Sequence, residues 1–168
     1  MGPGTKLPSL GHTTYENLKV AYYTAAKGLA DSGCDALLVE TTQDLLQAKA
    51  AVNGARDAIS RSKKDIVLIA QVTVETTGTM LMGSEIGAAL NALEPIGIDL
   101  IGLNCATGPA EMSEHLRVLS KCATVGISVM PNAGLPVLSD GGAHYPLAPL
   151  ELAAALKTFV KDYKVNLV

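Results

Sequence analysis

The sequence has no tryptophan, a single phenylalanine and only three cysteines among its 168 residues. Its core must therefore rest on Ala, Leu, Val and Ile. Three widely spaced cysteines do not fit a disulfide framework, so we expect reduced thiols and a cytoplasmic protein. Apolar residues make up 48% of the chain and charged residues 17%, which indicates a globular domain rather than a disordered chain.

Basic clusters and long apolar runs are also missing. The formal net charge is −3, so the sequence lacks the electrostatic footprint of a nucleic-acid-binding protein. No apolar run reaches membrane-spanning length. The opening MGPGTKLPSLGH has no signal-peptide apolar region, and Pro3 argues against its formal match to a myristoylation pattern. We therefore expect neither a nucleic acid nor a membrane as partner.

Short, near-continuous apolar runs alternate with amphipathic stretches. This pattern is typical of parallel strands that are covered on both faces, and units of about 30 residues fit βαβ crossovers. Thr13 with Glu16 predicts a capping box for the first helix, Gly33 its end, Thr42 the cap of the second helix, and Pro109 the start of the fourth. The predicted strands are 35–40, 65–74, 98–105 and 124–132, the predicted helices 14–32, 43–62, 84–93, 110–121 and 150–163, and VNLV (165–168) is read as the start of a further strand.

Two α/β architectures compete for this pattern. An open doubly wound sheet would bind a ligand at a switch point, whereas a (β/α)8 barrel needs about 250 residues. Four and a half strand units are too few for a closed barrel. We see no linker, so residues 1–168 are read as one domain.

In both architectures the chemistry collects at the carboxyl ends of the strands. Four consecutive predicted strands end in or near Glu40, Glu75, Asn104 with Cys105, and Asn132. We expect these side chains to share one rim. Glu40 can bind a substrate ammonium group or cap the next helix, Asn132 in PNAG can line a site or shape a turn, and Glu75 is read as a solvent contact.

The three cysteines differ in position. Cys34 and Cys122 precede strands, at the opposite face, and are expected to be buried packing residues. Cys105 at the rim is either a packing residue or a functional thiolate. A nucleophile needs a base, but His115 is predicted on a helix outside the rim, and nothing ties the loop residues His12 and His144 to Cys105. Catalytic zinc takes three protein ligands, and the rim offers one good thiolate.

Several motifs, in order, resemble the homocysteine-binding domain of the cobalamin-dependent methionine synthase family. They are MGPGTKLPSLGHTTYENL, LLVETTQDLLQAKAA, GLNCATGP and SVMPNAGLP, with weaker agreement in TTGTMLMGSE and GAHYPLAPLELA. The resemblance covers nearly the whole chain. PNAGLP favours this family over the betaine-using homocysteine methyltransferases.

The resemblance implies the later part of a (β/α)8 TIM barrel, incomplete within 1–168. In that family zinc is held by the cysteine of the NCA motif, which matches Cys105, and by a Cys-Cys pair expected after NLV; the first strands are expected before MGPG. Glu40 is then expected to bind the homocysteine amino group, and Asn132 to lie beside the metal. Zinc would hold the homocysteine sulfur as a thiolate, which takes a methyl group from methylcobalamin on another module.

The predicted function is therefore zinc-dependent methyl transfer to homocysteine, giving methionine in the parent enzyme, with this fragment alone inactive and poor at binding zinc. A non-catalytic half-barrel that associates with another chain is the second reading, because open sheet edges favour pairing. A different barrel enzyme, such as an aldolase or a pterin-binding transferase, is the third. The order Glu40, Cys105, Asn132 and the absence of a rim lysine count against it.

Overall fold

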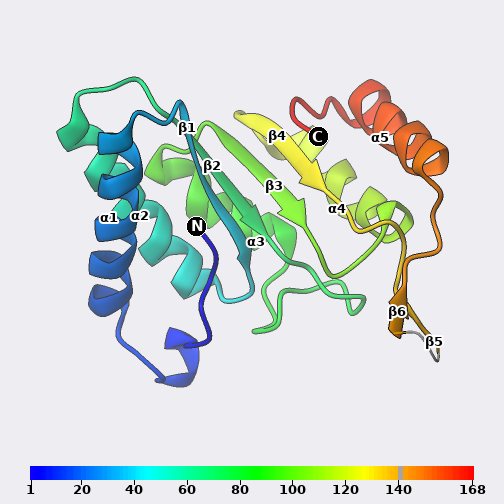
Figure 1. Cartoon of the computed structure of the whole chain (residues 1–168), viewed down its shortest axis with the longest axis horizontal. Helices are drawn as coiled ribbons and strands as arrows, with labels where there is room; N and C mark the ends of the chain where they lie inside the picture. Colours follow the sequence, from blue (N-terminus) through cyan, green and yellow to red (C-terminus); the bar gives the residue numbers. More distant parts are fainter. Residues whose placement is uncertain (140–141) are drawn as a thin grey trace.

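The fold is an α/β layer built on a single four-stranded parallel sheet (Figure 1), seen in a computed structural model that describes residues 1–139 and 142–168. The strands are β1 (Ala36–Thr42), β2 (Val67–Val72), β3 (Leu100–Asn104) and β4 (Gly126–Met130), in the order β1-β2-β3-β4. Because spatial order follows chain order and all neighbours are parallel, every strand ends at the same edge. The predicted parallel (β/α) units are confirmed.

Among the residues that the structure describes, five α-helices join or flank these strands. They are α1 (Tyr15–Ser32), α2 (Leu45–Ser62), α3 (Ile86–Leu93), α4 (Pro109–Cys122) and α5 (Pro149–Tyr163), with short 3-10 turns η1 (Pro8–Leu10) and η2 (Glu94–Ile96). In Figure 1 the helices lie behind the sheet and at its two sides, and the front face of the strands is left in view. Within the described residues, no helix is both long and apolar enough to cross a membrane.

The core lies between the sheet and the helices. Alternate strand residues point into it, among them Leu37, Val39, Leu68, Ile101 and Val129, all nearly or fully buried. The residues between them face the other side of the sheet, and this second face is open at its margins, where Val67 and Met130 are each 40% exposed, whereas Gln71 and Ser128 in its middle are buried. A sheet covered by helices on one face only is what a segment of a (β/α)8 barrel looks like.

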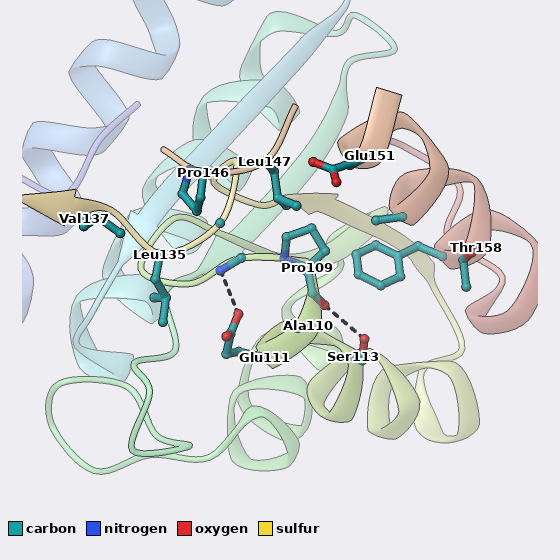
Figure 2. Close-up of a pocket in the computed structure, with 14 residues that line it drawn as sticks. Pro109, Ala110, Glu111, Ser113, Leu135, Val137, Pro146, Leu147, Glu151 and Thr158 are labelled. Carbon is teal, nitrogen blue, oxygen red and sulfur yellow. Dashed lines mark hydrogen bonds between the residues drawn. The ribbon is translucent and has the colours of Figure 1, made fainter. Parts of the chain in front are cut away.

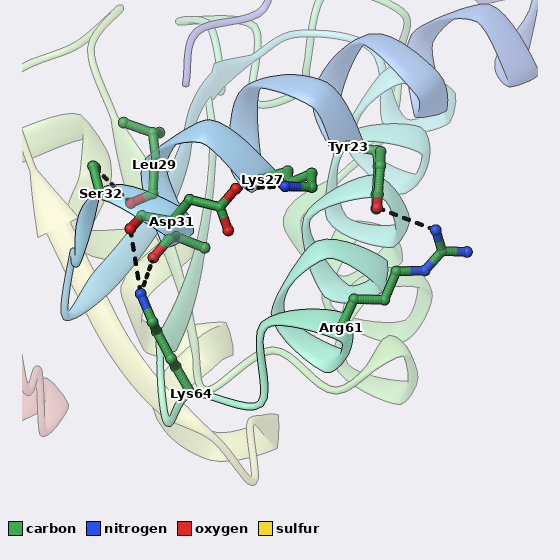
Figure 3. Close-up of polar contacts among 8 residues, drawn as sticks. Tyr23, Lys27, Leu29, Asp31, Ser32, Arg61 and Lys64 are labelled. Carbon is green, nitrogen blue, oxygen red and sulfur yellow. Dashed lines mark hydrogen bonds and ion pairs between the residues drawn. The ribbon is translucent and has the colours of Figure 1, made fainter.

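Helices α1 and α2 pack closely because small residues line their contact. A Cβ atom on Gly54 of α2 would lie 2.5 Å from the Lys19 carbonyl of α1. Figure 3 shows the polar contacts at the end of this pair, where Arg61 donates to the Tyr23 hydroxyl (3.1 Å) and Lys64 donates to the Ala30 carbonyl (2.6 Å). The cation of Lys64 thus meets the carbonyl end of α1, where a positive charge is favourable.

Two predicted helix caps are wrong by one or two residues. Thr14, not Thr13, caps α1 by accepting from the Asn17 N–H, and Gly33 ends that helix at a φ of 96° as predicted. Asp44, not Thr42, caps α2, with Oδ1 accepting from the Leu46 N–H at 2.9 Å. Thr42 stays in β1, where its hydroxyl donates to the Gln71 carbonyl. Because Asp44 caps α2, the reading of Glu40 as its cap is also wrong.

The long segment after β4 contains a feature that was not predicted. Strands β5 (Val137–Ser139) and β6 (Gly142–His144) form a small antiparallel hairpin that projects from the carboxyl end of the sheet (Figure 1). After α5 the chain returns to the sheet, and Leu167 makes a parallel bridge with Ser128 of β4. At the other side of the sheet the Met1 amino group donates to the Leu38 carbonyl of β1 at 2.6 Å.

Candidate functional site

The candidate site lies at the carboxyl edge of the sheet, where β1 and β3 bring two predicted residues together. Glu40 is near the end of β1, and Cys105 directly follows β3. Their side chains are joined through Thr41 and Asn104. The Thr41 hydroxyl bonds to the Glu40 carboxylate and lies 3.9 Å from Cys105 Sγ.

Asn104 is the centre of this arrangement. Its side-chain NH2 group donates to Thr41 Oγ1 (2.6 Å) and to Cys105 Sγ (3.1 Å), while its Oδ1 accepts from the Thr41 N–H (2.9 Å). The Asn104 carbonyl also accepts from the Thr73 hydroxyl of the segment after β2. Asn104 is 5% exposed, so its own polar atoms are largely removed from solvent, where losing a hydrogen bond is most costly.

The backbone at the site takes an uncommon conformation. Thr41, Cys105 and Ala106 have φ values of 57°, 59° and 57°, in the left-handed region that residues other than glycine rarely adopt. A β-branched threonine is especially disfavoured there. Non-glycine residues held in this way often cluster at functional sites, and here the surrounding hydrogen bonds hold them.

Asn132 reaches the same edge from the loop after β4. Its N–H donates to the Thr107 carbonyl at 3.1 Å, and the Cys105 N–H donates to Met130 at 3.2 Å. The loops of the NCATGP and PNAG motifs are therefore joined through their main chains. A Cβ atom on Gly108 would lie 2.8 Å from the Gly134 Cα, so the loops pack together more closely than side chains would allow.

Glu40 lies beside the first residues of the chain. Its N–H donates to the Met1 carbonyl, and its Oε1 lies 3.2 Å from where a Cβ atom on Gly2 would be. The Tyr22 hydroxyl donates to the Gly2 carbonyl at 2.8 Å. Burial, with a smaller contribution from the Glu40 charge, raises the pKa of Tyr22 to about 12, so the phenol stays protonated as a donor.

Glu75 and His115 share one cavity, and Cys105 is not among the residues that line it. They line a cavity of about 400 Å³ between the loop after β2 and α4, and Gln43 donates to Glu75 at 3.5 Å. His115 is half-buried, and burial lowers its pKa, an effect that Glu114 partly offsets. His12 accepts from the Leu7 N–H and is exposed, as is His144 in the hairpin.

The other two cysteines lie before strands at the amino-terminal edge, as predicted, but neither is fully buried. Cys34 is half-buried against the core, and Cys122 is exposed. The expectation of a buried thiol is wrong for Cys122 because it occupies the last turn of α4, where the core is covered instead by Leu116 and Leu119. All three cysteines are free thiols.

The rim residues do not by themselves form the zinc site that the family resemblance implies. Cys105 supplies one sulfur, which already accepts a hydrogen bond from Asn104. Across the part of the chain that the structure describes, no group of three or more His, Cys, Asp or Glu residues is placed to hold a metal ion. One thiolate does not make a zinc centre by itself, so these residues alone do not fit the metal.

An apolar cavity of about 630 Å³ adjoins the two motif loops (Figure 2). It lies between the start of α4, the segment after β4 and α5. At the end of the cavity beside the motif loops, the Glu111 carboxylate accepts a hydrogen bond from the Gly108 N–H at 3.1 Å and so fixes the start of α4. The cavity is lined mainly by apolar side chains, including Pro109, Leu135, Val137, Pro146, Leu147 and Phe159.

The sequence profile of the homocysteine S-methyltransferase family matches residues 1–168. The chain belongs to this family. It is 65% identical over 168 residues to a methionine synthase of Mycobacterium tuberculosis and 64% identical to a methionine synthase of Mycobacterium leprae. Each alignment covers 100% of this chain but only 14% of the relative. The predicted family membership is confirmed.

The fold comparison agrees with this. The apo homocysteine methyltransferase MmuM of Escherichia coli superposes with a TM-score of 0.74 at 17% identity, covering 99% of this chain and 54% of that one. The metallated form of the same enzyme gives a TM-score of 0.71 at 16% identity, covering 93% and 46%. At such low identity the likeness shows the shared fold, and the half coverage matches an incomplete barrel.

Sequence reasoning placed Asn104 at the rim without a role and missed Thr41. Both stand inside the motifs LLVETTQD and GLNCATGP, directly beside the residues that were singled out. The signal available was their polarity at the end of an apolar strand. The hydrogen bond between them spans 63 positions of sequence. It can be predicted only when the order and register of the strands are known.

Proposed function

We propose that residues 1–168 are part of a methionine synthase and supply one portion of its homocysteine-binding barrel, with the first strands and the Cys-Cys strand lying outside this segment. The observation that carries the proposal is the 65% identity, over all 168 residues, to a methionine synthase of which the segment is 14%. The reaction proposed for the intact enzyme is methyl transfer to the sulfur of homocysteine. A reducing compartment, the cytoplasm, suits the three free thiols.

Within that enzyme Glu40 is proposed to bind the homocysteine amino group. A carboxylate attracts an ammonium group, and Glu40 is only half-buried, so a ligand at the rim can reach it. Asn132, also half-buried, is proposed to line the same site from the neighbouring loop. The methyl donor is proposed to be cobalamin on another module, because the close relatives are methionine synthases.

Cys105 is proposed as one zinc ligand of a set completed by residues outside this segment. Zinc, when bound, supplies a site at which a thiol loses its proton. The segment's own contribution is the sulfur and its fixed direction, given by the Asn104 N–H and by the left-handed backbone at Cys105.

Isothermal titration of homocysteine into intact methionine synthase tests this proposal. Glu40→Gln keeps the size of the side chain and removes its charge, so we expect homocysteine affinity to fall at least tenfold while zinc content stays the same. Cys105→Ser should lower zinc content. Glu16→Gln, on the exposed face of α1, is the matched control and should change neither quantity. Unchanged affinity in Glu40→Gln would remove Glu40 from the site.

Zinc titration of the 168-residue chain alone tests the incomplete metal site. We expect weak binding that Cys105→Ser does not change appreciably, because one sulfur cannot hold zinc tightly. Tight, stoichiometric zinc that depends on Cys105 would show that the segment carries a complete site.

A half-barrel that associates with another chain is the second candidate. The observation that favours it is the second face of the sheet, which is open at its margins, where Val67 and Met130 are each 40% exposed. Sedimentation of the isolated chain over a range of concentrations distinguishes the two. Self-association is expected here, whereas a stable monomer would count against this candidate.

A further inference from the structure

The side-chain amide of Asn104 makes three hydrogen bonds at the rim. Its Oδ1 accepts from the main chain of Thr41, and its NH2 group donates to two different side chains, Thr41 Oγ1 and Cys105 Sγ. The orientation of the amide is fixed by chemistry. The Thr41 N–H can only donate, so the atom opposite it must be the oxygen and the other atom the nitrogen.

This orientation gives the hydrogen bonds a direction. Because Thr41 Oγ1 accepts a hydrogen from Asn104, its own single hydrogen is free to point elsewhere. Two acceptors are within reach, Cys105 Sγ at 3.9 Å and the Glu40 carboxylate, and the hydroxyl is bonded to the closer one, the carboxylate. One NH2 group therefore directs both the Thr41 hydroxyl toward Glu40 and an N–H toward Cys105 Sγ.

We propose that Asn104 is a positioning residue that couples Glu40 to Cys105, holding the carboxylate through Thr41 and the sulfur directly. The inference rests on the proposed function, because Glu40 and Cys105 are its two ends. Asn104 itself need not touch the substrate. It sets the separation and direction of the two groups that are proposed to meet the amino group and the sulfur of one homocysteine molecule.

A purely structural role for Asn104 makes a different prediction. Any buried residue that fills the space would then serve, and loss of ligand binding would follow loss of stability. Coupling requires a donor at this position. Asn104→Asp keeps the shape of the side chain but presents an acceptor, which would draw the Thr41 hydroxyl away from Glu40.

The test uses intact methionine synthase and measures the homocysteine dissociation constant by calorimetry, with thermal unfolding measured alongside. Asn104→Asp and Thr41→Val are each expected to weaken homocysteine binding about tenfold, the effect of one lost charge-assisted hydrogen bond. Thr41→Ser keeps the hydroxyl and should stay within about twofold of the parent. The double variant should be little worse than either single variant, because both break the same link.

Three outcomes would overturn the inference. Asn104→Asp could leave the dissociation constant unchanged, the two substitutions could multiply to about a hundredfold, or lost binding could track lost thermal stability in every variant. The Glu40→Gln variant separates this inference from the proposed function. If Glu40→Gln weakens binding and Asn104→Asp does not, the coupling alone is wrong; if Glu40→Gln has no effect, the assigned role of Glu40 is wrong and the coupling falls with it.

Discussion

The N–H of Asn132 donates to the carbonyl of Thr107 at 3.1 Å, and this bond fastens the loop after β4 to the loop after β3. The two loops can approach this closely because Gly108 and Gly134, which have no side chains, lie against each other. A Cβ atom on Gly108 would lie 2.8 Å from the Gly134 Cα, and one on Gly134 would lie 2.9 Å from Pro146 Cγ. The position of Asn132 relative to Cys105 therefore depends on residues that have no side chain.

Gly134→Ala should destabilise the chain and displace the PNAG loop. Gly134 has a φ of 89°, which an L-residue adopts at a cost, and the added methyl group would press on Pro146. Strain and overpacking together predict a loss of about 2–4 kcal/mol in the free energy of unfolding. Gly87→Ala in α3 is the control, because nothing lies within 4 Å of its added Cβ, and it should be neutral or slightly stabilising in urea unfolding. Equal effects of the two substitutions would contradict this account.

The strands and their shared edge could be predicted from sequence because apolar runs of strand length recur at regular spacing. The helix caps could not be placed as well. Thr42 and Asp44 are both good capping residues two positions apart, and the choice depends on how far β1 continues beside β2, where Thr42 bonds to Gln71. The β5–β6 hairpin was not predicted because it lies in a segment rich in glycine and proline. Such segments are predicted as loops whether or not they pair.

The candidate site was likewise predictable only in part. Glu40, Cys105 and Asn132 could be singled out because each follows an apolar run at a strand end. The link between Thr41 and Asn104 could not be foreseen, because it depends on left-handed backbone at Thr41, a conformation that threonine by itself disfavours. The exposure of Cys122 was likewise set by its place in the last turn of α4.

Gly102→Ala should destabilise the sheet. Gly102 lies in β3 between β2 and β4, and the Gln71 side chain reaches past it to donate to Ser128 Oγ at 3.1 Å. A Cβ atom on Gly102 would overlap the Ser128 carbonyl and hydroxyl oxygens. We expect a loss of about 1–3 kcal/mol in the free energy of unfolding. Gly28→Ala on the exposed face of α1, with open space around the added Cβ, should show no such loss.

Lys64→Gln should lower the melting temperature slightly. The ammonium group donates to the Ala30 carbonyl at 2.6 Å, at the negative end of α1 (Figure 3). An interaction of this kind at the surface predicts a decrease of about 1–3 °C at low salt and a smaller one at high salt. Lys157→Gln, at an exposed position of α5, is the control for loss of one positive charge. A salt-independent decrease would assign the effect to something other than the helix end.

His115 should make stability decrease on acidification. Burial lowers its pKa in the folded chain below the ordinary value of 6.5, and Glu114 offsets only part of this. The unfolded chain therefore takes up the proton first as the pH falls, so the free energy of unfolding decreases from about pH 7 downward until the folded histidine is also protonated. Urea unfolding at about pH 7.5 and about pH 5.5 measures this.

The matched pair for this experiment is His115→Gln and His12→Gln. The His115 side chain lines the cavity with Glu75, Glu111 and Glu114, whereas His12 lies exposed near η1. Carboxylates facing His115 favour its charged form, so only burial can produce the predicted sign. We expect His115→Gln to reduce the pH dependence by more than His12→Gln does. If His115→Gln instead made the chain more sensitive to acid, the three glutamates would outweigh burial at this position, and the cavity would favour a cationic group.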